Sequence, residues 1–176
     1  MRLAVAVALL LMSAPAAEAA VLPAPIAPAD SGKLQCYAPI AETKSCASLA
    51  GYQRRSDGKI YNPATVMISP SPLITMKSAT VVTIKDGKVC GFITADDAAT
   101  AEFLIAGKPA DAPQTAKMRE LLAKAQQHLF GREICTRYLP QTDGSLLASA
   151  TLDGAPQPPD QKVIWVSPED GYEVRP

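Results

Sequence analysis

Few side chains in this sequence are spaced for catalysis, and the most suggestive group mixes aromatic rings with cations. Tyr52, Arg54 and Arg55 come shortly before Lys59 and Tyr61. Guanidinium and ammonium groups beside aromatic rings can hold anions or pack on sugars. These five residues form our predicted binding surface, and the simpler interpretation is a solvated basic loop.

Ser56 and Lys59 match the Ser-x-x-Lys spacing of some acyl-transferring enzymes, in which a lysine assists a nucleophilic serine. Those enzymes place the serine at the start of a helix, whereas Asp57-Gly58 between the two residues is typical of a turn. The companion motifs Ser-Asp-Asn and Lys-Thr-Gly do not occur in the chain. A turn is the preferred interpretation, and a serine hydrolase that uses Ser56 and Lys59 is an alternative.

The chain has four cysteines, Cys36, Cys46, Cys90 and Cys135. An even number of cysteines in an exported chain predicts disulfides, because thiols oxidise outside the cytoplasm. We favour Cys36 with Cys46, which closes a short loop, and Cys90 with Cys135, which flank a predicted helical segment. The chain has no C-x-x-C pair, which argues against the other alternative, a thiol oxidoreductase.

The only histidine, His128, lies at the end of a predicted helix, where the helix dipole stabilises a protonated imidazole. With the cysteines bridged, the sequence lacks the three or four ligands that a zinc site needs. Asp96 and Asp97 fit the start of a helix better than a catalytic carboxylate pair. We therefore predict no catalytic residues, no metal and no other cofactor.

Residues 1–19 have the pattern of a secretory signal peptide, with an apolar run from Leu3 to Met12 and small residues at Ala17 and Ala19. The run is about half as long as a membrane-spanning helix. We predict cleavage after Ala19 and a periplasmic or secreted protein with no membrane span after cleavage. The alanine-rich signal suggests a bacterial source.

The 176 residues carry 17 basic and 17 acidic side chains and therefore no formal net charge. Proteins that bind nucleic acid usually have a basic excess, so this class is disfavoured. Residues 20–35, rich in proline and alanine, are predicted to be a flexible leader. Residues 36–176 fit one domain with its own core.

Five Asp-Gly pairs indicate tight turns between antiparallel strands. The clearest hairpin turns at Asp86-Gly87 and places Ile84 opposite Val89 and Thr83 opposite Cys90. Further strands are predicted at residues 64–69, 133–139, 146–152 and 162–166.

Two helices are predicted between these hairpins. Thr94 and Asp97 form a capping box that begins a helix ending at Gly107. The second helix runs from about Gln114 to Phe130, with an apolar stripe toward the core. The order of elements predicts an α+β fold, a mainly antiparallel sheet of about five to six strands with two inserted helices, stapled by disulfides.

Export, two bridges and the lack of a catalytic set lead to one hypothesis. The protein is an exported, soluble, non-enzymatic binding or structural protein of the cell envelope, and its partner is an envelope protein or a cell-wall component. A small exported enzyme, of either type named above, is the alternative.

Overall fold

The structure is a computed structural model that describes residues 21–176. Several of its neighbouring strands are joined by tight Asp-Gly turns. Asp86-Gly87 and Asp153-Gly154 have positive φ at both residues, the backbone that two-residue hairpins require. The first hairpin has the predicted register, with Ile84 opposite Val89 and Thr83 opposite Cys90. The predicted signal peptide and its cleavage site lie outside the described residues.

Eight strands form a closed antiparallel barrel. In spatial order they are β1 (Leu34–Tyr37), β3 (Ser48–Ala50), β5 (Ile60–Pro70), β6 (Leu73–Lys85), β7 (Lys88–Phe92), β10 (Glu133–Pro140), β11 (Leu146–Leu152) and β12 (Ala155–Val166). The pairing of β5 with β6 and of β1 with β12 closes the ring. Shorter strands add to the edges: β2 (Ser45–Cys46), β4 (Gln53–Arg54), β8 (Glu102–Ile105), β9 (Lys108–Pro109) and β13 (Glu173–Val174).

The predicted fold class is therefore wrong. An α+β sheet of five to six strands was expected, and the chain forms a closed barrel of eight strands with further strands attached. The reason is that ring closure joins β1 to β12, with Cys36 opposite Ile164, across most of the chain. Local periodicity carries no information about such a distant pairing.

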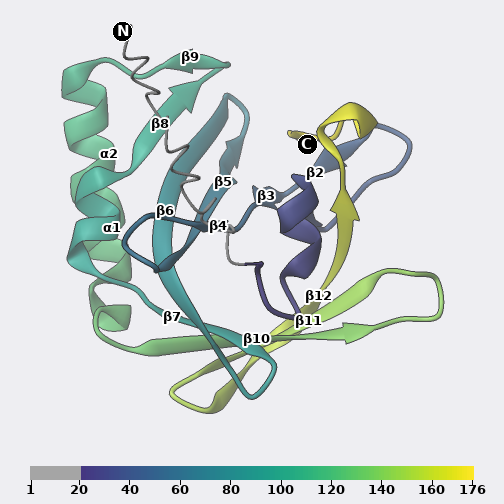
Figure 1. The fold of residues 1–176 in the computed structure, drawn as a ribbon. Coiled ribbons are helices and arrows are strands. Elements are labelled where there is room, and N and C mark those ends of the chain that lie inside the picture. The colour runs from purple at the N-terminus through teal and green to yellow at the C-terminus, as the bar shows by residue number, and fades with distance from the viewer. Residues whose placement is uncertain (1–20) are drawn as a thin grey trace, which may run out of the picture.

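The helices lie together on one side of the barrel, at the left of Figure 1, in the connection between β7 and β10. α1 (Ala95–Thr100) begins with the predicted capping box of Thr94 and Asp97. It ends well before Gly107, because residues 102–105 form β8 and pair with the first half of β6. β6 is longer than β7, so this half of β6 would otherwise lack a partner on that edge.

α2 (Ala112–Gln126) packs part of its apolar stripe against the outside of the barrel. Met118 and Leu122 contact a cluster formed by Met76, Ala101 and Phe103. Leu121, which the stripe predicted to face the core, is 54% exposed. The capping box at the start of α2 is formed by Asp111 and Gln114, and a short turn, η2 (Gln127–Leu129), follows the helix.

The proline-rich segment before β1 is folded, whereas a flexible leader was expected over residues 20–35. It contains a helical turn, η1 (Ala27–Ser31), drawn in purple near the centre of Figure 1. Leu22 and Ile26 are buried in the main core, and the Leu22 amide donates to Asp30 at 2.8 Å. The apolar residues among the prolines supply this packing.

The two predicted disulfides are both present. Cys90 lies directly opposite Cys135 on neighbouring strands, and their bond spans the helical connection. Cys36 and Cys46 form the other bridge and pack outside the barrel with Val166. A last turn, η3 (Pro168–Asp170), leads to β13, which pairs with β2 beside this second bridge.

Across residues 21–176, none of the helices has both the length and the apolar character needed to cross a membrane.

Candidate functional site

Alternate residues of the barrel strands point into its lumen, as strand geometry requires. On β1, Gln35 pairs with Trp165 and Tyr37 pairs with Val163. Val163 and Gln35 are fully buried. The inside of the barrel is thus the place where buried polar side chains can meet.

One half of the lumen is apolar. Leu22 and Ile26 from the N-terminal segment pack there against Ile60, Val82 and Val163. These side chains belong to the main core, which also contains Tyr52 and Tyr138. We call residues 22–31 the N-terminal plug.

The other half of the lumen contains a cluster of polar side chains. Tyr37 and Tyr52 both donate a hydrogen bond to Gln35 Oε1, at 3.2 and 2.9 Å. The hydroxyl of Tyr138 contacts the hydroxyl of Tyr37 and, at 3.2 Å, that of Tyr52. We call these four residues the tyrosine cluster.

Burial raises the pKa of all three phenols in this cluster. For Tyr37 and Tyr52 the nearby Tyr138 raises the pKa further. For Tyr138, hydrogen bonds with Tyr37, Tyr52 and Gln35 offset part of the effect of burial on the pKa. The phenols therefore stay neutral to a higher pH than an exposed tyrosine, and they act as hydrogen-bond donors and acceptors, not as bases.

The tyrosine cluster has more oxygen–oxygen contacts than phenolic protons that could form hydrogen bonds in them. Its four oxygen–oxygen contacts share three phenolic protons, because Gln35 Oε1 can only accept. At the same time Gln35 Nε2 is buried and has no hydrogen-bond partner. A buried donor without a partner is costly, so the cluster is not fully satisfied by its own members.

A half-turn of the Gln35 carboxamide would change this balance. Nε2 would then donate to Tyr37 and Tyr52, and each of these could donate to Tyr138. All four contacts would contain a proton, and the remaining proton of the Tyr138 hydroxyl could be donated to the turned Gln35 Oε1, which would take the buried place of Nε2. Tyr138 also lines the adjoining cavity, so a group bound there is within its reach.

The cavity beside the tyrosine cluster has a volume of about 190 Å³. Tyr37, Tyr52 and Tyr138 line it together with three polar residues of the surrounding strands, Asn62, Thr80 and Thr136, and with apolar residues such as Val82, Val89 and Ile134. None of the twelve lining residues is charged. We call this space the polar cup.

The five residues of the predicted binding surface divide between the inside and the outside of the barrel. Tyr52 points inward and belongs to the tyrosine cluster. The other four lie on the hairpin that joins β4 to β5, where Arg54, Arg55 and Lys59 are exposed and Tyr61 is partly buried. The structure thus does not bring all five together.

On this hairpin the charged groups mostly satisfy one another. The Arg55 guanidinium lies 3.8 Å above the ring of Tyr61, whose hydroxyl donates to Asp57 at 2.9 Å. The Lys59 amide lowers the pKa of Asp57 by donating to its carboxylate. A hollow of about 370 Å³ beside Arg55 and Tyr61 also contains Lys77 and Glu102, so it presents both signs of charge.

The residues of the two enzymatic alternatives lie apart from the cup. Ser56 is exposed in the turn of the β4–β5 hairpin, as is Lys59. All four cysteines are held in disulfides. Cys90, Glu133 and Cys135 lie close enough to resemble a metal site, but the two sulfurs are bonded to each other and are not available as thiolate ligands.

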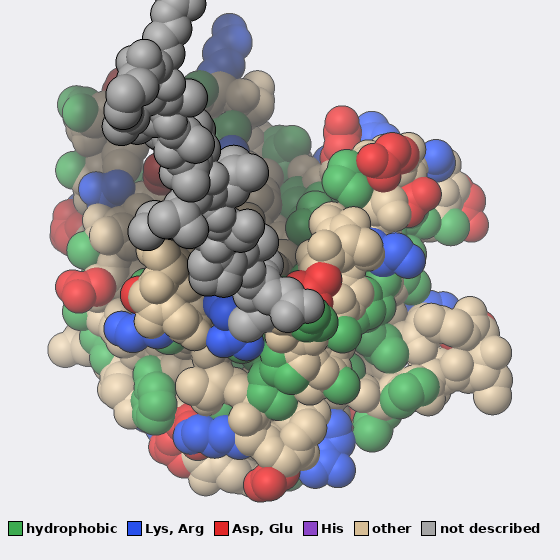
Figure 2. All heavy atoms as spheres, viewed as in Figure 1, with side chains coloured by type: hydrophobic (Ala, Val, Ile, Leu, Met, Phe, Trp, Pro, Cys, Tyr) green, Lys and Arg blue, Asp and Glu red, His purple; other side chains and the backbone are tan. Residues whose placement is uncertain are grey.

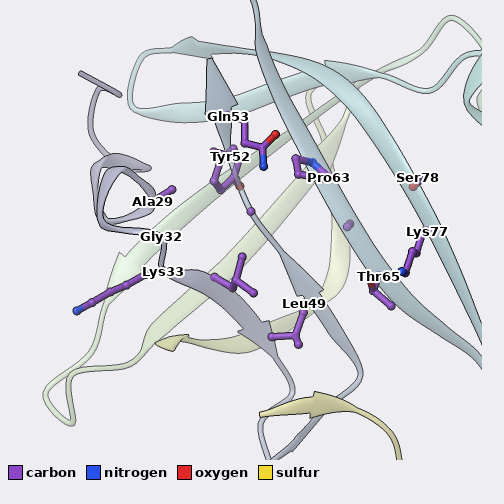
Figure 3. A pocket seen from close by; sticks show the side chains of 13 residues that line it. Ala29, Gly32, Lys33, Leu49, Tyr52, Gln53, Pro63, Thr65, Lys77 and Ser78 are labelled. Carbon is purple, nitrogen blue, oxygen red and sulfur yellow. The ribbon is translucent and has the colours of Figure 1, made fainter. Parts of the chain in front are cut away.

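Another hollow of about 370 Å³ lies outside the barrel and is shown in Figure 3. It runs between η1 and strands β3, β5 and β6, with Leu49, Pro63 and Thr65 along its floor. Lys77 points toward Thr65, and Lys33 points away on the opposite side. Its polar groups do not converge, so it offers a ligand less than the cup does.

On the face shown in Figure 2, acidic and basic side chains are interspersed and neither sign forms a continuous patch. This agrees with the zero formal net charge of the chain. The surface in this view gives no charged platform for a polyanion.

Three residues of the tyrosine cluster were missed by the sequence analysis. Gln35 lies in the segment assigned to the leader, and Tyr37 and Tyr138 have no spacing that suggests a site. The alternation of Gln35 and Tyr37 is a weak signal of one strand face. The tyrosine cluster forms only in the folded barrel, where β10 places Tyr138 beside Tyr37 and Tyr52.

No family model, curated protein or solved structure matches this chain.

Proposed function

We propose that this protein is an exported, non-enzymatic binding protein that holds one small, uncharged ligand in the polar cup. The observation that carries the proposal is the convergence of three neutral phenols and three further polar side chains, those of Asn62, Thr80 and Thr136, on a cavity without charged walls. A charged ligand would lose its hydration there and gain no ion pair in return. An uncharged ligand with hydroxyl or amide groups would complete the hydrogen bonds.

The size of the cup supports a ligand of about one ring. A cavity of about 150 Å³ accommodates benzene, and the cup is somewhat larger at about 190 Å³. Eight-stranded barrels commonly hold a single small ligand in this way. The two disulfides support the export that this proposal includes, because such bridges persist in oxidising compartments.

Binding can be followed through the only tryptophan. Trp165 packs in the lumen with its ring centroid 6.4 Å from that of Tyr52, which also lines the cup. We expect glucose or N-acetylglucosamine to change the fluorescence of Trp165 with a saturable dependence on concentration. Glucuronate, which has the same ring with a carboxylate, should bind far more weakly.

Replacement of Tyr138 tests the site directly. Tyr138→Phe removes a polar group from a residue that lines the cup, and we expect affinity to fall about tenfold, the effect of losing about 1.4 kcal/mol. Tyr61→Phe on the outer hairpin is the matched control and should bind as the wild type does. If none of the three sugars binds, or if glucuronate binds as well as glucose, the proposal is wrong.

A further inference from the structure

A second cavity lies beside the polar cup. It has a volume of about 320 Å³ and shares Tyr37 and Thr136 with the cup. Its remaining lining residues are Ala148, Ala150, Gln157, Pro158, Pro159 and Gln161. We call the part formed by Gln157, Pro158, Pro159 and Gln161 the mouth groove.

An irregularity in the barrel wall forms the mouth groove. Ala148 pairs with Gln161 and Ala150 pairs with Gln157, so one residue of β11 lies opposite three residues of β12. Two of those three are prolines, which have no N–H to donate to a ladder. The strands separate at this point, and Gln157 and Gln161 are exposed where the lumen meets solvent.

The chemistry of the groove continues that of the cup. Neither cavity has a charged lining residue, although 19% of the chain is charged. Two carboxamides supply donors and acceptors, and two prolines supply an apolar wall. Sugar rings match such a surface, because each ring carries uncharged hydroxyls on its edge and C–H groups on its faces.

We propose that the cup and the mouth groove together bind an uncharged oligosaccharide of at least two rings. The terminal ring occupies the cup, and the next ring lies between Pro158, Pro159 and the carboxamides of Gln157 and Gln161. The chain then leaves the barrel through the gap in the wall. This inference rests on the proposed function, because the first ring must bind in the cup.

The test compares sugars of increasing length by isothermal titration calorimetry. The probes are N-acetylglucosamine and its β-1,4-linked dimer and trimer, with glucose and cellobiose as the series without the acetamido group. We expect the dimer to bind the wild type about tenfold more tightly than the monomer, as one or two added hydrogen bonds would give. The third ring, which lies outside the groove, should add little.

Two variants separate the groove from the cup. Gln161→Ala should remove most of the gain of the dimer and leave the affinity for the monomer unchanged, and Tyr138→Phe should weaken both sugars. Gln127→Ala, an exposed carboxamide on η2 that lines neither cavity, is the control. Because Gln161 is exposed, its replacement should not unfold the protein.

The outcomes distinguish the two proposals. If the monomers bind and the dimers bind no more tightly, the groove inference is wrong and the cup proposal stands. If no sugar binds, both are wrong. If an uncharged peptide such as N-acetyl-tetra-alanine amide binds and the sugars do not, the groove recognises a peptide chain and the saccharide assignment is overturned.

Discussion

The hydroxyl groups of Tyr37, Tyr52 and Tyr138 depend on one another for their hydrogen bonds, and burial raises the pKa of each. An isolated tyrosine in this lumen would leave its hydroxyl without a partner, which is costly. Three together, with Gln35, satisfy most of their groups. A residue-level site of this kind is defined by proximity across strands, not by spacing along the chain.

The buried phenols predict a dependence of stability on alkaline pH. Burial raises their pKa in the folded protein, whereas in the unfolded chain they ionise near pH 10, the ordinary value. Above about pH 10 the unfolded state loses protons that the folded state keeps, so the free energy of unfolding falls as pH rises. Urea denaturation at a series of pH values from 8 to about 11.5 would measure the slope.

The control for this prediction is the variant with Tyr37, Tyr52 and Tyr138 all replaced by phenylalanine, compared over the same range. Its stability should fall less between pH 10 and pH 11.5. An equal fall in both proteins would show that other groups cause the alkaline loss.

At the scale of elements, the Asp86-Gly87 hairpin and the two disulfides were predictable from the sequence, and the closure of the strands into a barrel was not. Asp86-Gly87 fixed one register because two residues with positive φ leave only one way for the strands to pair. Residues 101–105 have apolar spacing that fits a helix or a strand. Residues 102–105 form strand β8 because they pair with the first half of β6. Strand formation here depends on pairing with a distant segment, and the local sequence pattern does not indicate that pairing.

The longer disulfide should contribute more to stability than the shorter one. Cys90 and Cys135 are 45 residues apart, and Cys36 and Cys46 are 10 apart. Loop closure predicts about 4 kcal/mol for the first and somewhat less than about 3 kcal/mol for the second. Replacing each pair by alanine and measuring urea denaturation should show the larger loss for the Cys90–Cys135 pair.

A reversed order of these losses would mean that packing around the sulfurs, not the entropy of the unfolded chain, dominates. The Cys36–Cys46 bridge packs with Val166 and Tyr172, so its removal also tests how much the outer cluster contributes.

At the scale of the whole molecule, the N-terminal plug is part of the main core of the barrel. Ile26 is fully buried in this core, although the proline-rich composition around it suggested a leader. Composition describes the average character of a segment, and here two apolar side chains, Leu22 and Ile26, determine where it lies. The sequence could not reveal this, because the lumen that receives them exists only after the ring closes.

Replacement of Ile26 measures the contribution of the plug. Ile26→Ala should lower the free energy of unfolding by about 2–5 kcal/mol, because it leaves a cavity in the core. Val21→Ala is the matched control, since Val21 is 75% exposed and its truncation should have little effect. Equal stability of the two variants in urea denaturation would contradict the described packing of the plug.

The pairing of β1 with β12 also has a consequence for the order of folding events. The first strand of the barrel obtains its second neighbour only when the last strand arrives, more than a hundred residues later in the chain. Until then both strands expose unpaired backbone groups that could join another copy of the chain. The high average sequence separation of the native contacts therefore favours slow folding.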